Sequence, residues 1–103
     1  MIKLEIGICG SKWWWYVNGL HRLNGPAVIE TSGYQAWWQF GKLHKTDGPA
    51  VMWNNGYRAW WQHGLLHRLN GPAIIYSNSE VEYWINDQRL SEYELMFMNE
   101  SAV

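Results

Sequence analysis

The sequence predicts a mainly β protein: an extended antiparallel meander of about four hairpins, or about eight short strands, with one C-terminal capping helix. Three observations support this fold class. One motif recurs at intervals of 23 residues, as HRLNGPAVI from His21, HKTDGPAVM from His44 and HRLNGPAII from His67. Short β-prone segments within each repeat are separated by glycine turns. The C-terminal segment SEYELMFMNE contains neither Gly nor Pro, as expected of a helix at the end of the array.

The 23-residue interval organises the whole chain, whose 103 residues are few enough for one domain. Leu4 and Ile6 align with Ala27 and Ile29, so the N-terminus supplies the second half of an earlier unit. We therefore expect a single repeat domain over residues 1–103, with a half-repeat at 2–10, units at about 11–33, 34–56 and 57–79, a terminal unit at 80–90 and a helix at about 91–100.

Each full unit is expected to contain two strands joined by a glycine turn. One strand carries a Trp-Trp pair, as at residues 57–63, and the other follows Gly-Pro, as at residues 50–53. The turn sequences NNG, TSG and CG supply the glycine at positive φ that a tight hairpin needs. The longer segment GKLHKTDGP is expected to make the turn between units.

The C-terminal sequence SEYELMFMNE is expected to form the closing helix. Ser91 precedes Glu94 by three residues, which is the spacing of a capping box. Repeat arrays need such a terminal cap because each unit otherwise exposes its core to solvent.

The composition limits the classes of partner. The formal net charge is -1, so no electrostatic field attracts long nucleic acid, and membrane binding is not expected. The longest apolar segments are only a few residues, too short for a bilayer span. Cys9 is the single cysteine, which fits a reducing compartment and predicts a cytoplasmic protein. Nine Trp and six Tyr provide much of the apolar surface, although the mean hydropathy is only -0.37.

The pattern WW..G..HR..GPA, in a 23-residue unit with one hairpin and an aromatic-rich first strand, resembles the membrane occupation and recognition nexus (MORN) repeat. This variant is similar to short repeat proteins encoded by bacteria and by large or tailed viruses. The resemblance covers roughly residues 3–90 and implies an array of hairpins. Gly-Pro-Ala stands where the usual unit begins its second strand with Gly-x-Gly. Such arrays serve as scaffolds, as lipid or protein contacts and as parts of enzymes, so the resemblance implies no single function.

The two rings of each Trp pair are expected to lie on opposite faces of the sheet, because consecutive side chains on a strand alternate. The set expected to face the core comprises Tyr34, Ala36, Trp38 and Phe40, and then Tyr57, Ala59, Trp61 and His63. The opposite face is expected to carry an aromatic ladder of Trp14, Trp37, Trp60 and Tyr83. Polar residues that include Lys12, Gln35, Gln39, Arg58 and Gln62 surround this ladder.

Trp53 is expected to extend the ladder. If Asn55-Gly56 is a two-residue turn, Trp53 lies opposite Arg58 and can stack on its guanidinium. The same register places Val51 opposite Trp60.

Two interpretations of the ladder remain open. In the first, the rings pack on one another and on long polar side chains, completing a thin sheet. The alternation inverts in the last unit, which suggests that Leu95, Met96 or Met98 covers the end of the ladder. In the second, the ladder binds a flat ligand, because stacking contributes about 1–3 kcal/mol per base in nucleic-acid binders.

The repeated histidines His21, His44 and His67 are expected to be structural. Adjacent copies should lie roughly 10 Å apart, too far for two of them to share one metal ion. We expect each imidazole to satisfy backbone groups in the turn between units. The alternative is an anion-binding edge formed with the cation that follows each histidine.

No phosphate loop, nucleophile elbow or HExxH motif occurs, so we expect no enzyme, no catalytic residue, no cofactor and no metal site. The sequence favours a binding module for a small nucleotide-like molecule. The resemblance alone implies the setting, that of virus-encoded proteins that sequester host immune signals in the host cytoplasm. The candidate ligand-binding residues are Trp14, Trp37, Trp60, Trp53, Arg58, Tyr83, Arg22 and Arg68. The alternative is a protein-interaction or scaffold array that binds a host protein or a second copy of itself as a homo-oligomer.

Overall fold

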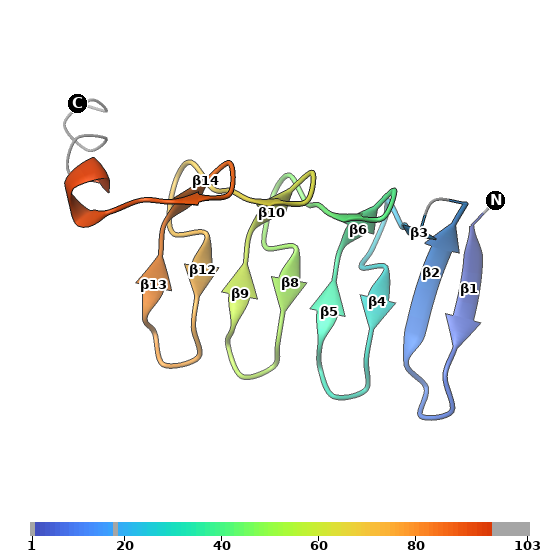
Figure 1. Ribbon diagram of the computed structural model, residues 1–103. Helices are drawn as coiled ribbons and strands as arrows, with labels where there is room; N and C mark the ends of the chain where they lie inside the picture. The colour runs from blue at the N-terminus through green and yellow to red at the C-terminus, as the bar shows by residue number, and fades with distance from the viewer. Residues whose placement is uncertain (1, 18, 96–103) are drawn as a thin grey trace.

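The computed structural model describes residues 2–17 and 19–95, and it confirms a mainly β antiparallel meander (Figure 1). Within these residues a nine-stranded sheet has the order β1-β2-β4-β5-β8-β9-β12-β13, with β3 paired to β2, and three two-stranded sheets join β6 to β7, β10 to β11 and β14 to β15. The strands are β1 (Lys3–Ile6), β2 (Lys12–Tyr16), β3 (Gly19–Leu20), β4 (Val28–Ile29), β5 (Gln35–Ala36), β6 (Trp38–Gln39), β7 (Lys42–Leu43), β8 (Val51–Met52), β9 (Arg58–Ala59), β10 (Trp61–Gln62), β11 (Leu65–Leu66), β12 (Ile74–Ile75), β13 (Val81–Glu82), β14 (Trp84–Ile85) and β15 (Gln88–Arg89).

The described residues thus form 15 strands rather than about eight, because most units contain a second, smaller hairpin along one side of the main sheet (Figure 1). Phe40 and Gly41 turn the chain between β6 and β7 with φ of 50° and 77°. One unit later His63 and Gly64 turn it between β10 and β11 with φ of 52° and 80°. Positive φ at both central residues is typical of a type I′ hairpin turn. The expectation that Phe40 and His63 face the core was therefore wrong, and both side chains are exposed.

The main hairpins have a different register from the expected one. Trp53 N–H donates to the Tyr57 carbonyl at 3.0 Å, and Gly56, with φ of 99°, donates to the Trp53 carbonyl at 3.2 Å. The loop therefore contains three residues and places the glycine last. As a result Met52, and not Trp53, pairs with Arg58. The expectation that Trp53 lies opposite Arg58 was wrong.

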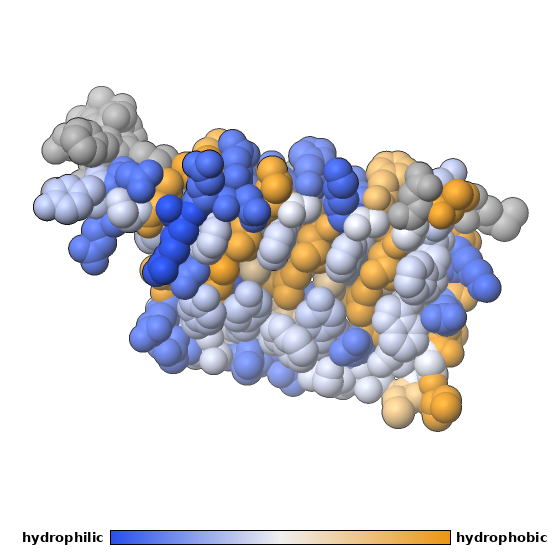
Figure 2. Space-filling view, viewed as in Figure 1, coloured by the Kyte–Doolittle hydropathy of each residue, from blue (hydrophilic) through white to orange (hydrophobic). Residues whose placement is uncertain are grey.

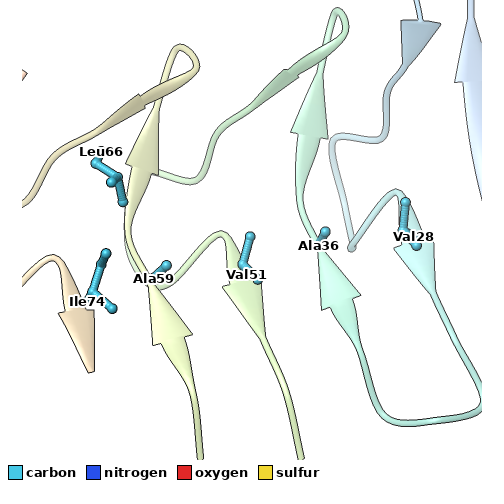
Figure 3. Packing of buried hydrophobic residues seen from close by; sticks show 6 residues of the cluster. All are labelled: Val28, Ala36, Val51, Ala59, Leu66 and Ile74. Atoms are coloured by element: carbon cyan, nitrogen blue, oxygen red, sulfur yellow. The ribbon is translucent and has the colours of Figure 1, made fainter. Parts of the chain in front are cut away.

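The core is a single thin layer along the main sheet, and the molecule measures 49 × 29 × 18 Å. Its central cluster contains only aliphatic side chains, namely Val28, Ala36, Val51, Ala59, Leu66 and Ile74 (Figure 3). Half-buried aromatic residues pack against this cluster, including Trp38 and Trp61 as the alternation predicted. On the face shown in Figure 2, hydrophobic residues form stripes parallel to the strands, separated by paler rows.

The C-terminal cap begins as the sequence predicts. Residues 92–95 are helical, Glu94 N–H donates to Ser91 Oγ at 3.2 Å, and Ser91 N–H donates to Glu94 Oε1 at 3.2 Å. The rest of the expected helix, with Met96 and Met98, lies outside the described residues. In the parts of the chain that the structure describes, no helix has the length and apolar character to cross a membrane.

Candidate functional site

The three tryptophans of the aromatic ladder are covered by cations of their own units. The guanidinium Cζ of Arg22 lies 3.8 Å from the ring centroid of Trp14, and that of Arg68 lies 3.9 Å from the ring of Trp60. Between them Lys45 Nζ lies 4.2 Å from the ring of Trp37. Each contact is a cation–π interaction that occupies one face of the ring.

The Gly-Pro-Ala motif holds the two arginines in place. Arg22 Nη1 donates to the Pro26 carbonyl at 3.2 Å, and Arg68 Nη1 donates to the Pro72 carbonyl at 3.1 Å. A Cβ added to Gly25 would lie 2.7 Å from Arg22 Cζ, so a larger residue here would displace the guanidinium. Arg22 and Arg68 are therefore engaged within the repeat, which leaves them less free for the ligand contacts expected from the sequence.

A sequence signal for this arrangement exists, although residue-by-residue interpretation missed it. Each ladder Trp is followed eight residues later by a cation, whereas Tyr83 is followed at that distance by Ser91. The last unit, which has Tyr83 in place of the tryptophan, therefore also lacks the cation. Tyr83 instead lines a hollow of about 370 Å³ together with Arg68 of the preceding unit and the apolar side chains of Ile85, Leu90 and Leu95.

Lys45→Arg is expected to raise the free energy of unfolding by about 0.5–1 kcal/mol. A guanidinium at this position can stack on Trp37 and also donate to the Pro49 carbonyl, as the arginines of the adjacent units do. Urea unfolding followed by circular dichroism measures the change. Lys42→Arg, an exposed substitution in the same unit, is the control, and equal effects of the two would contradict the assigned role.

The three repeated histidines connect neighbouring units. Each Nδ1 accepts a backbone N–H from the small hairpin of the next unit: His21 from Phe40 at 2.9 Å, His44 from His63 at 3.0 Å and His67 from Asn86 at 3.0 Å. The ring centroids of His21 and Phe40, and those of His44 and His63, are 4.3 Å apart. The expected contact of each imidazole with backbone groups is present. Among residues 2–17 and 19–95, no cluster of three His, Cys, Asp or Glu side chains could hold a metal ion.

These contacts also predict a pH dependence. His44 Nδ1 accepts a hydrogen bond, so the folded state requires the neutral ring. Burial and then the nearby His63 lower the pKa of His44 below its ordinary value of 6.5. The unfolded chain therefore binds the proton more readily, so this contribution is complete above pH 6.5 and is lost as the pH falls below it. Urea midpoints measured from about pH 7.5 to 5.5 should fall, and His44→Gln should flatten that slope; an unchanged slope would contradict this assignment.

Three of the predicted ligand residues meet at one hollow. Trp53, Arg58 and Trp60 line a space of about 350 Å³ beside the turn of the β8–β9 hairpin, together with Pro49, Met52, Asn54 and Gly56. The ring of Trp53 also packs against Tyr34, with centroids 4.6 Å apart, while the Arg58 side chain is exposed. We call this space the Trp60 hollow.

Trp60 lines a second hollow as well, of about 440 Å³. Its walls are formed by the loop at residues 46–48 and the loop at residues 67–70. Of the other predicted ligand residues, Arg68 lines this second hollow. The predicted residues that line neither space at Trp60 are Trp14, Trp37, Arg22 and Tyr83.

Comparisons of the chain with protein-family models, with curated proteins and with solved structures find no match. The resemblance to the MORN repeat therefore stays a prediction from the residues of the repeat.

Proposed function

We propose that this protein is a non-enzymatic binding module that holds a planar, anionic, nucleotide-like molecule in the Trp60 hollow. The observation that carries the proposal is the meeting of Trp53, Arg58 and Trp60 around one open space of about 350 Å³. An aromatic ring and a guanidinium in one hollow provide a stacking surface for a base and a partner for a phosphate.

Arg58 is the cation best placed for such a ligand. Its side chain is exposed and forms no ion pair within the described part of the chain. Arg68, in contrast, is stacked on Trp60 and donates to the Pro72 carbonyl. Arg58 can therefore bind an anion without breaking a contact that the repeat needs.

The hollow combines residues that the repeat does not require. Positions equivalent to Trp53 and Arg58 are Glu30 and Gln35 in the preceding unit, and they are Tyr76 and Val81 in the following unit. A ligand site should differ from the repeat pattern, because residues that serve only the fold recur with it.

In its sharper form, the proposal is that the ligand is a nucleotide-derived immune signal, sequestered in the host cytoplasm by a virus-encoded protein. The viral setting is supported by the resemblance of the repeat alone. The second candidate, a protein-interaction or scaffold array that binds a host protein, gains support from the outer edge of β1, which no other described strand pairs with.

A calorimetric titration with AMP and with a cyclic dinucleotide as probes tests the proposal. We expect at least one probe to bind, and we expect Arg58→Gln to weaken its binding by about tenfold or more, because one charged hydrogen bond is lost. Lys12→Gln is the matched control, since Lys12 occupies the equivalent position two units earlier and is also exposed.

Binding of neither probe, or equal weakening by the two glutamine variants, would contradict a site at the Trp60 hollow. A double substitution Arg58→Ala and Trp60→Ala that changes the oligomeric state without affecting any ligand would favour the interaction array instead.

A further inference from the structure

We propose that two copies of this chain associate by antiparallel pairing of their β1 strands around a twofold axis. β1 is the outermost strand of the nine-stranded sheet, at the N-terminal end of the array (Figure 1). The proposal goes beyond ligand binding, because the Trp60 hollow lies two units away from this edge.

The free edge of β1 is long and regular. β1 pairs with β2 over four residues, whereas the other neighbouring strands of the described sheets pair over two. Such an edge is a template for the addition of another strand.

The backbone groups available for pairing follow from the hairpin register. Glu5 pairs with Trp13, and the same register places Gly7 opposite Ser11. Gly7 and Ser11 form a hydrogen-bonded pair, because Gly7 N–H donates to the Ser11 carbonyl at 2.8 Å. Hydrogen-bonded pairs alternate along an antiparallel ladder, so Glu5 and Lys3 point their backbone groups toward β2. Leu4 therefore directs its N–H and C=O outward, as does Ile6.

The side chains of β1 are complementary to those of a second β1. Pairing centred on Leu4 places Lys3 opposite the partner's Glu5, and Glu5 opposite the partner's Lys3. Both contacts fall at non-hydrogen-bonded positions, where side chains approach most closely.

The other face of β1 provides an apolar contact in the same register. Leu4 meets the partner's Leu4, and Ile2 meets the partner's Ile6. In the single chain the exposed fractions are 43% for Ile2, 46% for Leu4 and 60% for Ile6, so pairing would remove apolar surface from water.

Head-to-tail association of the array is disfavoured by charge. Joining β13 to the β1 of a second copy would repeat the β9–β12 pairing, in which Ala59 faces Ile74. The repeat register then places Glu82 opposite the partner's Glu5, and like charges directly opposite each other are destabilising.

Glu82 also has partners within its own chain. Its Oε1 accepts from Trp84 Nε1 at 2.9 Å, its Oε2 accepts from the Tyr76 hydroxyl at 3.1 Å, and Arg89 lies 3.7 Å away. The hydrogen bond from Trp84, with that from Tyr76, lowers the pKa of Glu82, so the carboxylate stays charged at neutral pH. The symmetric β1 contact avoids this repulsion.

Sedimentation equilibrium of the full chain tests the proposal. We expect a reversible dimer of twice the 12.2 kDa chain mass. Lys3→Glu alone and Glu5→Lys alone each create like-charge pairs and should weaken dimerisation by about tenfold or more. The double variant Lys3→Glu, Glu5→Lys should restore it, and an equimolar mixture of the two single variants should form a heterodimer.

A proline substitution provides an independent test of the edge. Leu4→Pro removes an outward N–H that the β1–β2 hairpin does not use, so the fold should persist by circular dichroism while dimerisation is lost. Val81→Pro removes the equivalent outward N–H at the opposite edge and should leave the dimer intact. A chain that is monomeric at all concentrations, an open series of oligomers, or a dimer unaffected by the charge variants and by Leu4→Pro would overturn the proposal.

Discussion

Leu66→Ala is expected to lower the free energy of unfolding by about 2–5 kcal/mol, the range for truncating a buried leucine. Leu66 is only 8% exposed and belongs to the core cluster, in which Leu66 and Ile74 are the largest side chains. Because the core is one thin layer built largely from Ala and Val, few neighbouring side chains can move to fill the cavity. Urea unfolding measured by the change in midpoint provides the test.

Leu65→Ala is the matched control for this prediction. Leu65 precedes Leu66 in β11, pairs with Gln62 and is 39% exposed. Its truncation should cost only about 1 kcal/mol, because 39% of its surface stays in water in the folded state, against 8% for Leu66. Equal losses for the two leucines would mean that the sheet does not have the assigned buried face.

His44→Ala is expected to lower the free energy of unfolding by about 2–4 kcal/mol. The substitution leaves the His63 N–H without its acceptor and removes the stacked contact between the two imidazoles. Because His44 joins the second full unit to the third, the loss falls at the centre of the array.

His63→Ala separates the two contributions. This variant keeps the backbone N–H that donates to His44 Nδ1 and loses only the stacked ring, so we expect a loss of about 1 kcal/mol or less. A larger loss for His63→Ala than for His44→Ala would show that the hydrogen bond is not what connects the units.

The repeat period made much of the fold predictable. The period places the main hairpins, side-chain alternation assigns Trp38 and Trp61 to the core face, and the capping-box spacing identifies Ser91 and Glu94 as the helix cap. These features depend on local turn chemistry and on side-chain alternation, and both can be read directly from the residues.

The small hairpins were not predictable from local sequence. Phe40 and His63 adopt positive φ, which is unfavourable for such side chains in isolation. Their conformation is supported by hydrogen bonds to His21 and His44, each 19 residues earlier. A contact between units thus overrides the local preference.

The candidate site was predictable only in part, because some of its contacts also form between residues far apart in the sequence. The residues Trp53, Arg58 and Trp60 do meet at one hollow, although the predicted register was off by one residue. The cations over the ladder were expected to be available for ligands, because one sequence does not reveal that Arg68 folds back onto Trp60. The close approach to Gly71 that permits this contact becomes visible only in three dimensions.

The most direct test of ligand binding at the Trp60 hollow is native mass spectrometry of the purified chain, before and after incubation with a mixture of mononucleotides and cyclic dinucleotides. The proposal predicts one extra nucleotide-sized mass per chain, which denaturation releases and which the double substitution Arg58→Ala and Trp60→Ala abolishes. Chains that carry no added mass under either condition would contradict it.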